Sequence, residues 1–288
     1  MPFQGTTYTL KLIQQFTNTT TATNYGNEQG VRGTSIPVHE NLVNGPFYRY
    51  PDWDRPTQFL LTKTHCGGRS MEPSPSEYVE TARSFEIACR SGNRIVNDTK
   101  EFVIYASSIP KRAIHLIRNP FDNVVARLHL EQKRWAREEK DQHKLREFNA
   151  SKEGFQAWCR FQDVRSEKEE KSSRYFDDEI WEWAQDLPCH AEFMRYTWWH
   201  NLALETIRRI NLPLHSLFYE NYTQNWDETV QQMFEFLQLS PADGASPLEF
   251  IAGKTYLDYF EQRHVALAKG LVSTLASPES WALLEHYF

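Results

Sequence analysis

Residues 112–129 (RAIHLIRNPFDNVVARLH) place a short, mostly apolar segment directly before a helical pattern. The spacing predicts a buried strand over residues 113–117 and a helix from Phe121 onward, with Arg118 and Pro120 between them. A helix N-terminus offers N–H groups and a positive dipole, and a guanidinium adds a bidentate charge. We therefore expect an anion to bind at this turn.

Two further segments have the character of buried strands. Residues 59–63 (FLLTK) and 214–219 (LHSLFY) alternate along the chain with helical patterns. This alternation predicts an α/β fold of three layers, a central parallel sheet flanked by helices on both faces. We expect a single domain over residues 1–288, with one more strand before Pro2 and therefore outside this sequence.

Residues 131–185 interrupt this alternation. They are dense in charges of both signs, and mixed charges at helical spacing are typical of solvated helix faces. We expect a charged helical insertion there. A cluster of aromatic residues begins at its end and continues beyond it. We expect this cluster to be core packing, with stacking on a sugar ring or a purine as the alternative.

The overall composition disfavours two kinds of partner. The chain has 288 residues and a net charge of -6, whereas proteins that bind duplex nucleic acid usually carry a basic excess. No segment approaches the about 18 consecutive apolar residues of a membrane-spanning helix, and no signal peptide is visible. We expect no nucleic-acid partner, and membrane contact only through an anchor outside this sequence.

Cysteines and Asn-x-Ser/Thr sequons bear on the cellular compartment. The four sequons are at Asn18, Asn97, Asn149 and Asn221. With four cysteines they favour an oxidising, secretory compartment over the cytoplasm, which is the alternative. Sequence cannot fix the pairing of the cysteines. We expect the nearest neighbours to pair, Cys66 with Cys89 and Cys159 with Cys189.

The beginning of the chain contains a second candidate anion site. Gly5, Thr6 and Thr7 come just before an apolar stripe at helical spacing. Gly5 lets the backbone approach a phosphate, and the two hydroxyls and the helix N–H groups can bind its oxygens. The alternative is a threonine-capped amphipathic helix without a ligand.

A candidate catalytic pair ends the strand predicted over residues 59–63. Lys63 and His65 are two positions apart, so they lie on the same face of an extended chain. At the carboxyl end of a strand they point into the crevice where open α/β sheets bind ligands. The histidine can take a proton from a hydroxyl, and the lysine can stabilise developing negative charge. The alternative is a surface histidine on a glycine-rich loop.

Residues 253–255 (GKT) match only the end of a Walker A loop. The earlier glycine of that motif falls at Leu248, and no apolar strand leads into the segment. The segment is therefore not a Walker A loop, which disfavours a P-loop phosphotransferase that uses ATP.

Four segments, in order, resemble motifs of the sulfotransferases that use 3′-phosphoadenosine-5′-phosphosulfate (PAPS) and resemble P-loop kinases in fold. They are PFQGTTY at residues 2–8, LTKTH at 61–65, the strand–Arg-Asn-Pro–helix at 113–126 and LFYE at 217–220. Each motif alone has low to moderate specificity, but their order across nearly the whole chain is a strong signal. The chain is more similar to Golgi carbohydrate sulfotransferase-like proteins of the WSC-domain type than to cytosolic enzymes.

The resemblance implies transfer of a sulfuryl group from PAPS to a hydroxyl, above all of a glycan, in the Golgi or secretory lumen and without a metal. His65 accepts the proton of the attacking hydroxyl, Lys63 stabilises the sulfuryl group, and Arg118 pairs with the 3′-phosphate. The residues implied to bind PAPS are Gln4, Gly5, Thr6, Thr7, Tyr8, Arg118, Tyr219 and Lys254.

Several departures from the family pattern leave a second function open. The lysine of the first loop is Phe3 here. The serine that helps to bind the 3′-phosphate is Ala126, for which Asn123 or Arg127 could compensate. The C-terminal Arg-Lys-Gly segment has no clear copy, and Lys254 and Arg263 are the candidates to replace it. The alternative function is a non-catalytic, sulfotransferase-like module that binds nucleotides or glycans.

Overall fold

The parallel strands form two separate pairs in the computed structural model. Strand β1 (Thr20–Thr23) pairs with β2 (Leu60–Lys63), and β5 (Ala113–Ile117) pairs with β6 (Leu214–Phe218). A hairpin of β3 (Ser91–Val96) and β4 (Thr99–Ile104) is antiparallel. The structure describes residues 5–17, 20–23, 60–66, 81–96, 99–104, 106–108, 110–137, 141–173, 177–246, 248–252 and 255–288.

Helices account for most of the described chain. Two short 3₁₀ helices, η4 (Leu257–Tyr259) and η5 (Glu285–Tyr287), lie near the C-terminus. The α-helices are α1 (Thr6–Thr17), α2 (Ala82–Arg90), α3 (Pro120–Trp135), α4 (Gln142–Glu147), α5 (Lys152–Ser173), α6 (Asp178–Ala184), α7 (His190–Arg209), α8 (Asn221–Gln224), α9 (Trp226–Leu237), α10 (Gln262–Leu275) and α11 (Pro278–Leu284).

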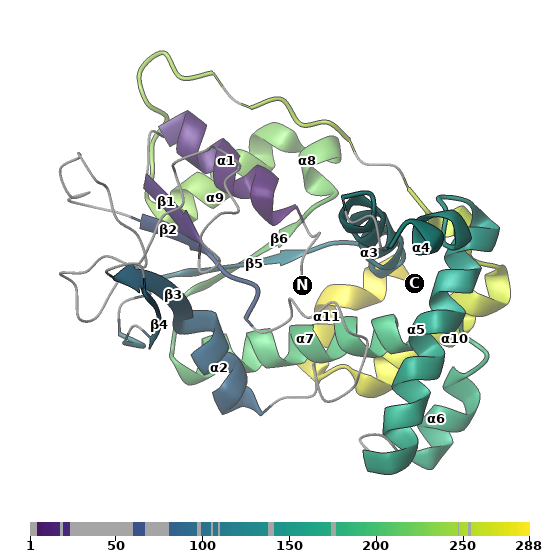
Figure 1. Ribbon diagram of the computed structural model, residues 1–288. Helices are drawn as coiled ribbons and strands as arrows, with labels where there is room; N and C mark the ends of the chain where they lie inside the picture. The colour runs from purple at the N-terminus through teal and green to yellow at the C-terminus, as the bar shows by residue number, and fades with distance from the viewer. Residues whose placement is uncertain are drawn as a thin grey trace.

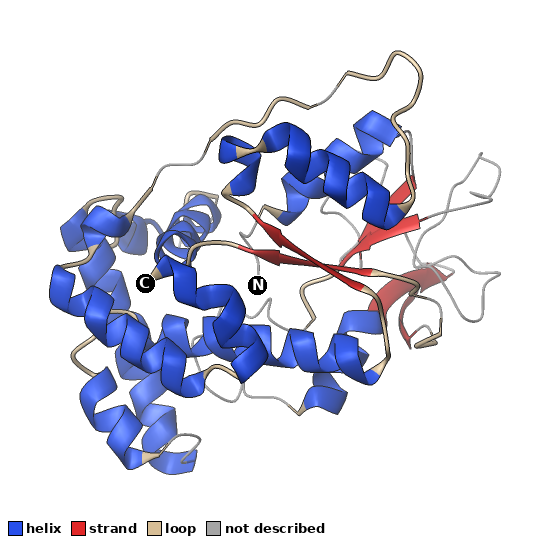
Figure 2. Cartoon of the chain, turned by 180° about the vertical axis from the view of Figure 1, so that it is seen from behind, coloured by secondary structure: helices blue, strands red, loops and turns tan. Residues whose placement is uncertain are grey.

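Helices lie on both sides of the β5–β6 pair (Figure 1). On one side, Leu12 and Ile13 of α1 and Met233 of α9 pack with Leu116 and Leu217 of the two strands. On the other side run α7 and α11, as the view from behind also shows (Figure 2). The α/β class and the parallel pairing are confirmed. One central sheet in three layers is not, because the described parallel strands form two pairs.

A larger core joins α3, α5, α7 and α10. Its centre is a group of edge-to-face rings, in which Phe121 lies 5.4 Å from Phe193 and 5.0 Å from Phe260 between ring centroids. Residues 131–185 are mostly helical where described, and Phe155 and Trp158 of α5 are fully buried in this core. One face of the charged helical segment therefore packs into the protein interior, which its charge pattern did not indicate.

The two nearest-neighbour disulfides are both present. Cys66, which follows β2, is bonded to Cys89 of α2, and Cys159 of α5 is bonded to Cys189 at the start of α7. The pairing is confirmed, and it is consistent with an oxidising secretory environment. Among the helices that the structure describes, none has both the length and the hydropathy to cross a membrane.

Candidate anion-binding site

Gly5 precedes α1 in a backbone conformation that favours glycine. Its φ is +86°, and its carbonyl oxygen accepts a hydrogen bond from the Thr9 N–H at 3.0 Å, which begins the helix. A Cβ atom on Gly5 would lie 2.2 Å from Cδ2 of Tyr219, so the Tyr219 ring packs directly on the glycine backbone. The first turn of α1 contains no acidic residue, so no carboxylate there opposes an incoming anion.

Lys63 brings the end of β2 to the beginning of α1. Its Nζ atom donates a hydrogen bond to Oγ1 of Thr7 at 3.0 Å, and this contact is exposed to solvent. A hydrogen bond thus joins Lys63, which was predicted to be catalytic, to Thr7, which was predicted to bind PAPS and lies far away in the sequence. The arrangement puts a positive charge beside the α1 N-terminus.

Arg118 and Tyr219 follow the neighbouring strands β5 and β6. The Tyr219 N–H donates to the Ile117 carbonyl at 2.8 Å, which extends the strand pairing by one residue. The Arg118 guanidinium carbon lies 4.8 Å from the centroid of the Tyr219 ring. Tyr219 therefore touches both Gly5 and Arg118, and it brings the two predicted anion sites together.

The N-terminus of α3 is already satisfied by the protein. Oδ1 of Asn119 accepts hydrogen bonds from the N–H groups of Phe121 at 2.9 Å and Asp122 at 3.4 Å. The Asn119 N–H itself donates to Oε1 of Glu220 at 2.8 Å, and Pro120 has no N–H. The expectation that this helix end offers N–H groups to an anion is therefore wrong. Any anion bound at this turn must rely on the Arg118 side chain.

Two carboxylates lie close to Arg118. Glu220 accepts a hydrogen bond from the Tyr287 hydroxyl at 2.7 Å, and Asp122 accepts one from the Tyr256 N–H at 2.7 Å. Burial raises the pKa of Asp122, although that hydrogen bond and the charge of Arg118 lower it. These acidic neighbours reduce the net positive charge that Arg118 offers to a ligand.

His65 is buried next to a disulfide. Its side chain is 3% exposed, so it is not a surface histidine on a mobile loop. The Trp199 Nε1–H donates to its carbonyl at 3.0 Å, and Cys66, with a φ of +47°, is bonded to Cys89. The backbone at His65 is therefore held from α7 and from α2 at the same time.

Two aromatic residues of α7 hold the backbone of both candidate functional segments. Tyr196 donates from its hydroxyl to the Arg118 carbonyl at 2.8 Å, and Trp199, about one turn later, donates to the His65 carbonyl. The sequence showed these side chains only as members of an aromatic cluster. Their spacing of three residues was the visible signal, but nothing local indicated which backbone each one would bind.

A buried pair of histidines lies between these two aromatic residues. Nε2 of His115 on β5 and Nδ1 of His200 on α7 are 2.7 Å apart. Burial lowers the pKa of His115 to about 3 and also lowers the pKa of His200, so both rings are neutral at physiological pH. Sequence inspection did not single out either histidine, because His115 falls inside a strand and His200 inside an aromatic helix.

The remaining predicted residues are only partly placed. Gln4 and Lys254 lie outside the described residues. The Tyr8 hydroxyl donates to the Leu248 carbonyl at 2.9 Å, so its side chain contributes to packing. Asn123 and Arg127 are fully buried, and Arg127 forms an ion pair with Glu192 of α7. No contact in the described residues links either side chain to Arg118, so the structure does not support the expectation that they compensate for Ala126.

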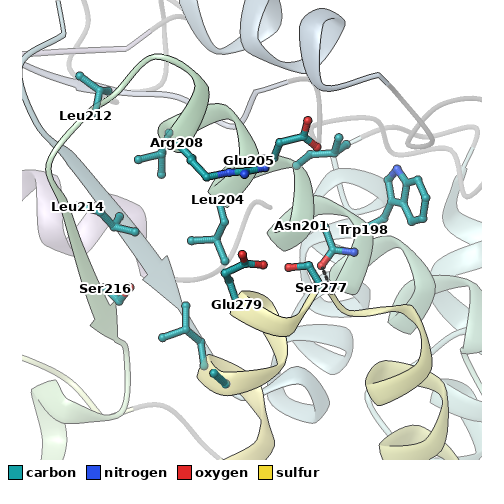
Figure 3. A pocket seen from close by; sticks show the side chains of 14 residues that line it. Trp198, Asn201, Leu204, Glu205, Arg208, Leu212, Leu214, Ser216, Ser277 and Glu279 are labelled. Atoms are coloured by element: carbon teal, nitrogen blue, oxygen red, sulfur yellow. Dashed lines mark hydrogen bonds between the residues drawn. The ribbon is translucent and has the colours of Figure 1, made fainter.

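A cavity of 660 Å³ lies away from these residues, between α7, β6 and α11 (Figure 3). Leu214 and Ser216 line it from the amino-terminal half of β6, whereas Tyr219 follows the other end of that strand. Asn201 and Ser277 in its wall bond to each other at 2.8 Å. The cavity is therefore separate from the candidate anion-binding site.

The described residues contain no group of three or more His, Cys, Asp or Glu side chains placed to hold a metal ion. Comparisons with protein-family models, with curated proteins and with solved structures found no match for this chain. A function for this chain must therefore follow from its sequence motifs and from the geometry of the site.

Proposed function

We propose that this protein is a PAPS-dependent sulfotransferase that acts on a hydroxyl of a carbohydrate. The observation that supports this most is the position of Tyr219, whose ring packs on Gly5 and lies 4.8 Å from the Arg118 guanidinium. A helix N-terminus and an arginine, each able to bind an anion, thus share one aromatic neighbour. A nucleotide with phosphates at its 3′ and 5′ positions matches that pair.

Each side chain has a part in the proposed transfer. His65 accepts the proton of the acceptor hydroxyl, whose oxygen bonds to sulfur as the bond from sulfur to the 5′-phosphate oxygen breaks. Lys63 and the α1 N-terminus stabilise the negative charge left on that phosphate, and Arg118 binds the 3′-phosphate. PAPS supplies the activated sulfuryl group. Positioning and electrostatic stabilisation provide most of the rate, as in phosphoryl transfer.

The proposal extends to the fold and to the compartment. The β1–β2 and β5–β6 pairs would belong to one central parallel sheet, because Lys63, Arg118 and Tyr219 come from the carboxyl ends of β2, β5 and β6 and belong to one proposed site. The two disulfides support a place in the Golgi or secretory lumen. An experimental structure that left the two strand pairs in separate sheets would contradict the first point.

Calorimetry with adenosine 3′,5′-bisphosphate tests donor binding. The wild-type protein is expected to bind it, and Arg118→Gln to bind it at least about 10-fold more weakly, because a hydrogen bond to a charged group contributes about 1.5–3 kcal/mol. Arg209→Gln, at a half-exposed position near the end of α7, is the matched control and is expected to bind like wild type. Tighter binding of ATP than of the bisphosphate would favour a phosphotransferase.

Transfer of radiolabelled sulfate from PAPS to a panel of glycans tests catalysis. His65→Ala is expected to lower kcat by about 10²–10⁴-fold, the usual contribution of a general base, with little change in KM for PAPS. His143→Ala, on the exposed surface of α4, is the control. An unchanged kcat in His65→Ala would remove His65 from the mechanism.

A non-catalytic binding module is the second candidate. Two observations favour it. The N–H groups at the N-terminus of α3 are bonded within the protein, and the side chains of Asn123 and Arg127 are buried. A 3′-phosphate would therefore have fewer hydrogen-bond donors than a working enzyme needs. Binding of the bisphosphate without transfer to any glycan of the panel would support this function over the first.

A further inference from the structure

Of the four sequons, two lie among the described residues, and their surroundings differ. Asn149 is exposed, in the turn between α4 and α5. Asn221 is the first residue of α8 and is partly buried, between Glu220 of the candidate site and Tyr222, which is 2% exposed. A bulky modification therefore has room at Asn149, whereas at Asn221 it would lie against the candidate site.

The hydrogen bonds around Asn149 engage its side-chain oxygen in the turn that precedes α5. Oδ1 of Asn149 accepts from the Ser151 N–H at 3.1 Å, and Oγ of Ser151 accepts from the Gly154 N–H at 3.1 Å, which caps α5. A Cβ on Gly154 would lie 2.3 Å from the Asn149 carbonyl oxygen, so the turn packs closely on the first turn of the helix. The side-chain oxygen of Asn149 thus stabilises the turn that leads into α5.

The amide nitrogen of Asn149 retains a replaceable hydrogen. Its Nδ2 donates to the Arg146 carbonyl at 3.3 Å, a contact that uses one of its two hydrogens. The turn is also held from the other side, because the Tyr259 hydroxyl donates to the Ala150 carbonyl at 3.3 Å. Substitution of the second hydrogen keeps every one of these contacts.

We propose that Asn149 carries an N-linked oligosaccharide and that Asn221 does not. A bond forms between Nδ2 of Asn149 and the anomeric carbon of a lipid-linked oligosaccharide diphosphate. The bond from that carbon to the diphosphate breaks, and the amide loses one proton. The proposal rests on the secretory compartment that the disulfides indicate, and it is independent of sulfuryl transfer. Nucleotide binding is measured separately, so either proposal can fail alone.

The test directs the full chain into the secretory pathway of eukaryotic cells by a cleavable signal peptide. Protein from the medium and from the cells is treated with peptide N-glycosidase in H₂¹⁸O, which marks each glycosylated Asn as an ¹⁸O-labelled Asp. The Asn149 peptide is expected to carry the label and the Asn221 peptide to lack it. An unlabelled Asn149 peptide, or a labelled Asn221 peptide in secreted protein, would overturn the proposal.

Asn149→Asp is the matched variant, because it keeps an oxygen for the Ser151 N–H and has the sequence that enzymatic deglycosylation leaves. It is expected to lose the mass of one glycan and to melt at the same temperature as the deglycosylated wild type. Asn221→Asp is expected to keep the wild-type glycan mass. An unchanged glycan mass in Asn149→Asp would contradict the proposal, whether or not the variant is fully secreted.

Discussion

Gly5 and Tyr219 constrain each other at the candidate site. The absence of a side chain on Gly5 lets the Tyr219 ring reach the backbone, and the same ring lies under the Arg118 guanidinium. The positive φ of Gly5 would also strain any other residue at this position. A single methyl group on Gly5 therefore disturbs the backbone, the ring and the position of the arginine together.

Gly5→Ala is expected to destabilise the protein by about 2–5 kcal/mol, the sum of a left-handed conformation and overpacking against Tyr219. Denaturant unfolding measures this. Gly244→Ala is the matched control, because Gly244 has a φ of +72° but no atom within 4 Å of its added Cβ. It should lose only about 1–2 kcal/mol. Equal losses in the two variants would show that the Tyr219 contact has no energetic role.

The buried histidines predict a pH dependence of stability. Burial lowers the pKa of His115 from 6.5 to about 3 and that of His190 from 6.5 to about 4. Between these values and pH 6.5 each of these two histidines binds more protons in the unfolded chain than in the folded protein, so the stability that they contribute is lost as the pH falls. The free energy of unfolding is expected to change by roughly 1.4 kcal/mol per pH unit for each histidine that is protonated in the unfolded chain and neutral in the folded protein.

Denaturant unfolding between pH 7 and pH 4 measures this slope. His115→Gln removes one titrating group and keeps a hydrogen-bonding partner for His200, so it is expected to flatten the curve. His143→Gln, at an exposed position, is the control for the loss of a histidine as such. A slope in His115→Gln as steep as that of the wild type would show that His115 does not contribute.

At the scale of elements, α7 begins without a cap from its own sequence. Its N-cap residue Cys189 has a φ of +63° and makes no side-chain capping bond. Asp163 of α5 accepts hydrogen bonds from the N–H groups of Cys189 at 2.8 Å and Ala191 at 3.1 Å. The disulfide from Cys159, one turn earlier on α5, holds the same point. Helix α5 therefore caps α7 from outside.

Asp163→Ala is expected to cost about 2–4 kcal/mol, because it leaves two N–H groups near the protein interior without a partner. Burial raises the pKa of Asp163 well above its ordinary value. Asp163→Asn keeps only one of the two acceptor oxygens. It is therefore expected to cost about 1–2 kcal/mol, less than Asp163→Ala, because one N–H group loses its partner. Thr81→Ala, which removes the exposed cap of α2, should cost about 1 kcal/mol. Equal stability of Asp163→Ala and wild type in denaturant unfolding would contradict the capping role.

At the scale of the whole molecule, the candidate site lies where separate elements meet. The α1 N-terminus and the ends of β2, β5 and β6 supply its side chains, while α7 supports the backbone at two points. Figure 1 shows α7 running along one side of β5 and β6, with α1 on the other side. The geometry of the site therefore depends on the packing of both helix layers.

The two disulfides are expected to differ in their effect on function. They close loops of similar length, with sequence separations of 23 and 30, so each stabilises the fold by about 3–4 kcal/mol in the chain-entropy model. Only the bond between Cys66 and Cys89 lies beside His65. Replacing this pair by serine should lower kcat for sulfuryl transfer, whereas replacing Cys159 and Cys189 should lower stability and leave kcat largely unchanged. Equal effects on kcat would contradict the positioning of His65.

Local patterns predicted several features that the structure confirms. Residues 113–117 form a strand, a helix follows that begins at Pro120, one residue before the predicted Phe121, and the nearest cysteines pair. These features depend on apolar spacing, on the missing N–H of proline and on short separations along the chain. The prediction that the N-terminus of α3 offers free N–H groups to an anion was wrong. The Asn119 side chain caps the helix, and Glu220, far along the chain, accepts a hydrogen bond from the Asn119 N–H.

The sequence by itself predicted three strands, over residues 59–63, 113–117 and 214–219, and the residues that end them, whereas β1, β3 and β4 were not predicted. Tertiary structure alone decided that Tyr219 lies on Gly5, that Lys63 reaches Thr7, and that α7 binds the backbone at Arg118 and His65. The physical reason is the range of the interactions. Strand and helix patterns arise between near neighbours in the chain, whereas these contacts join distant segments and exist only when the helices pack around the strands.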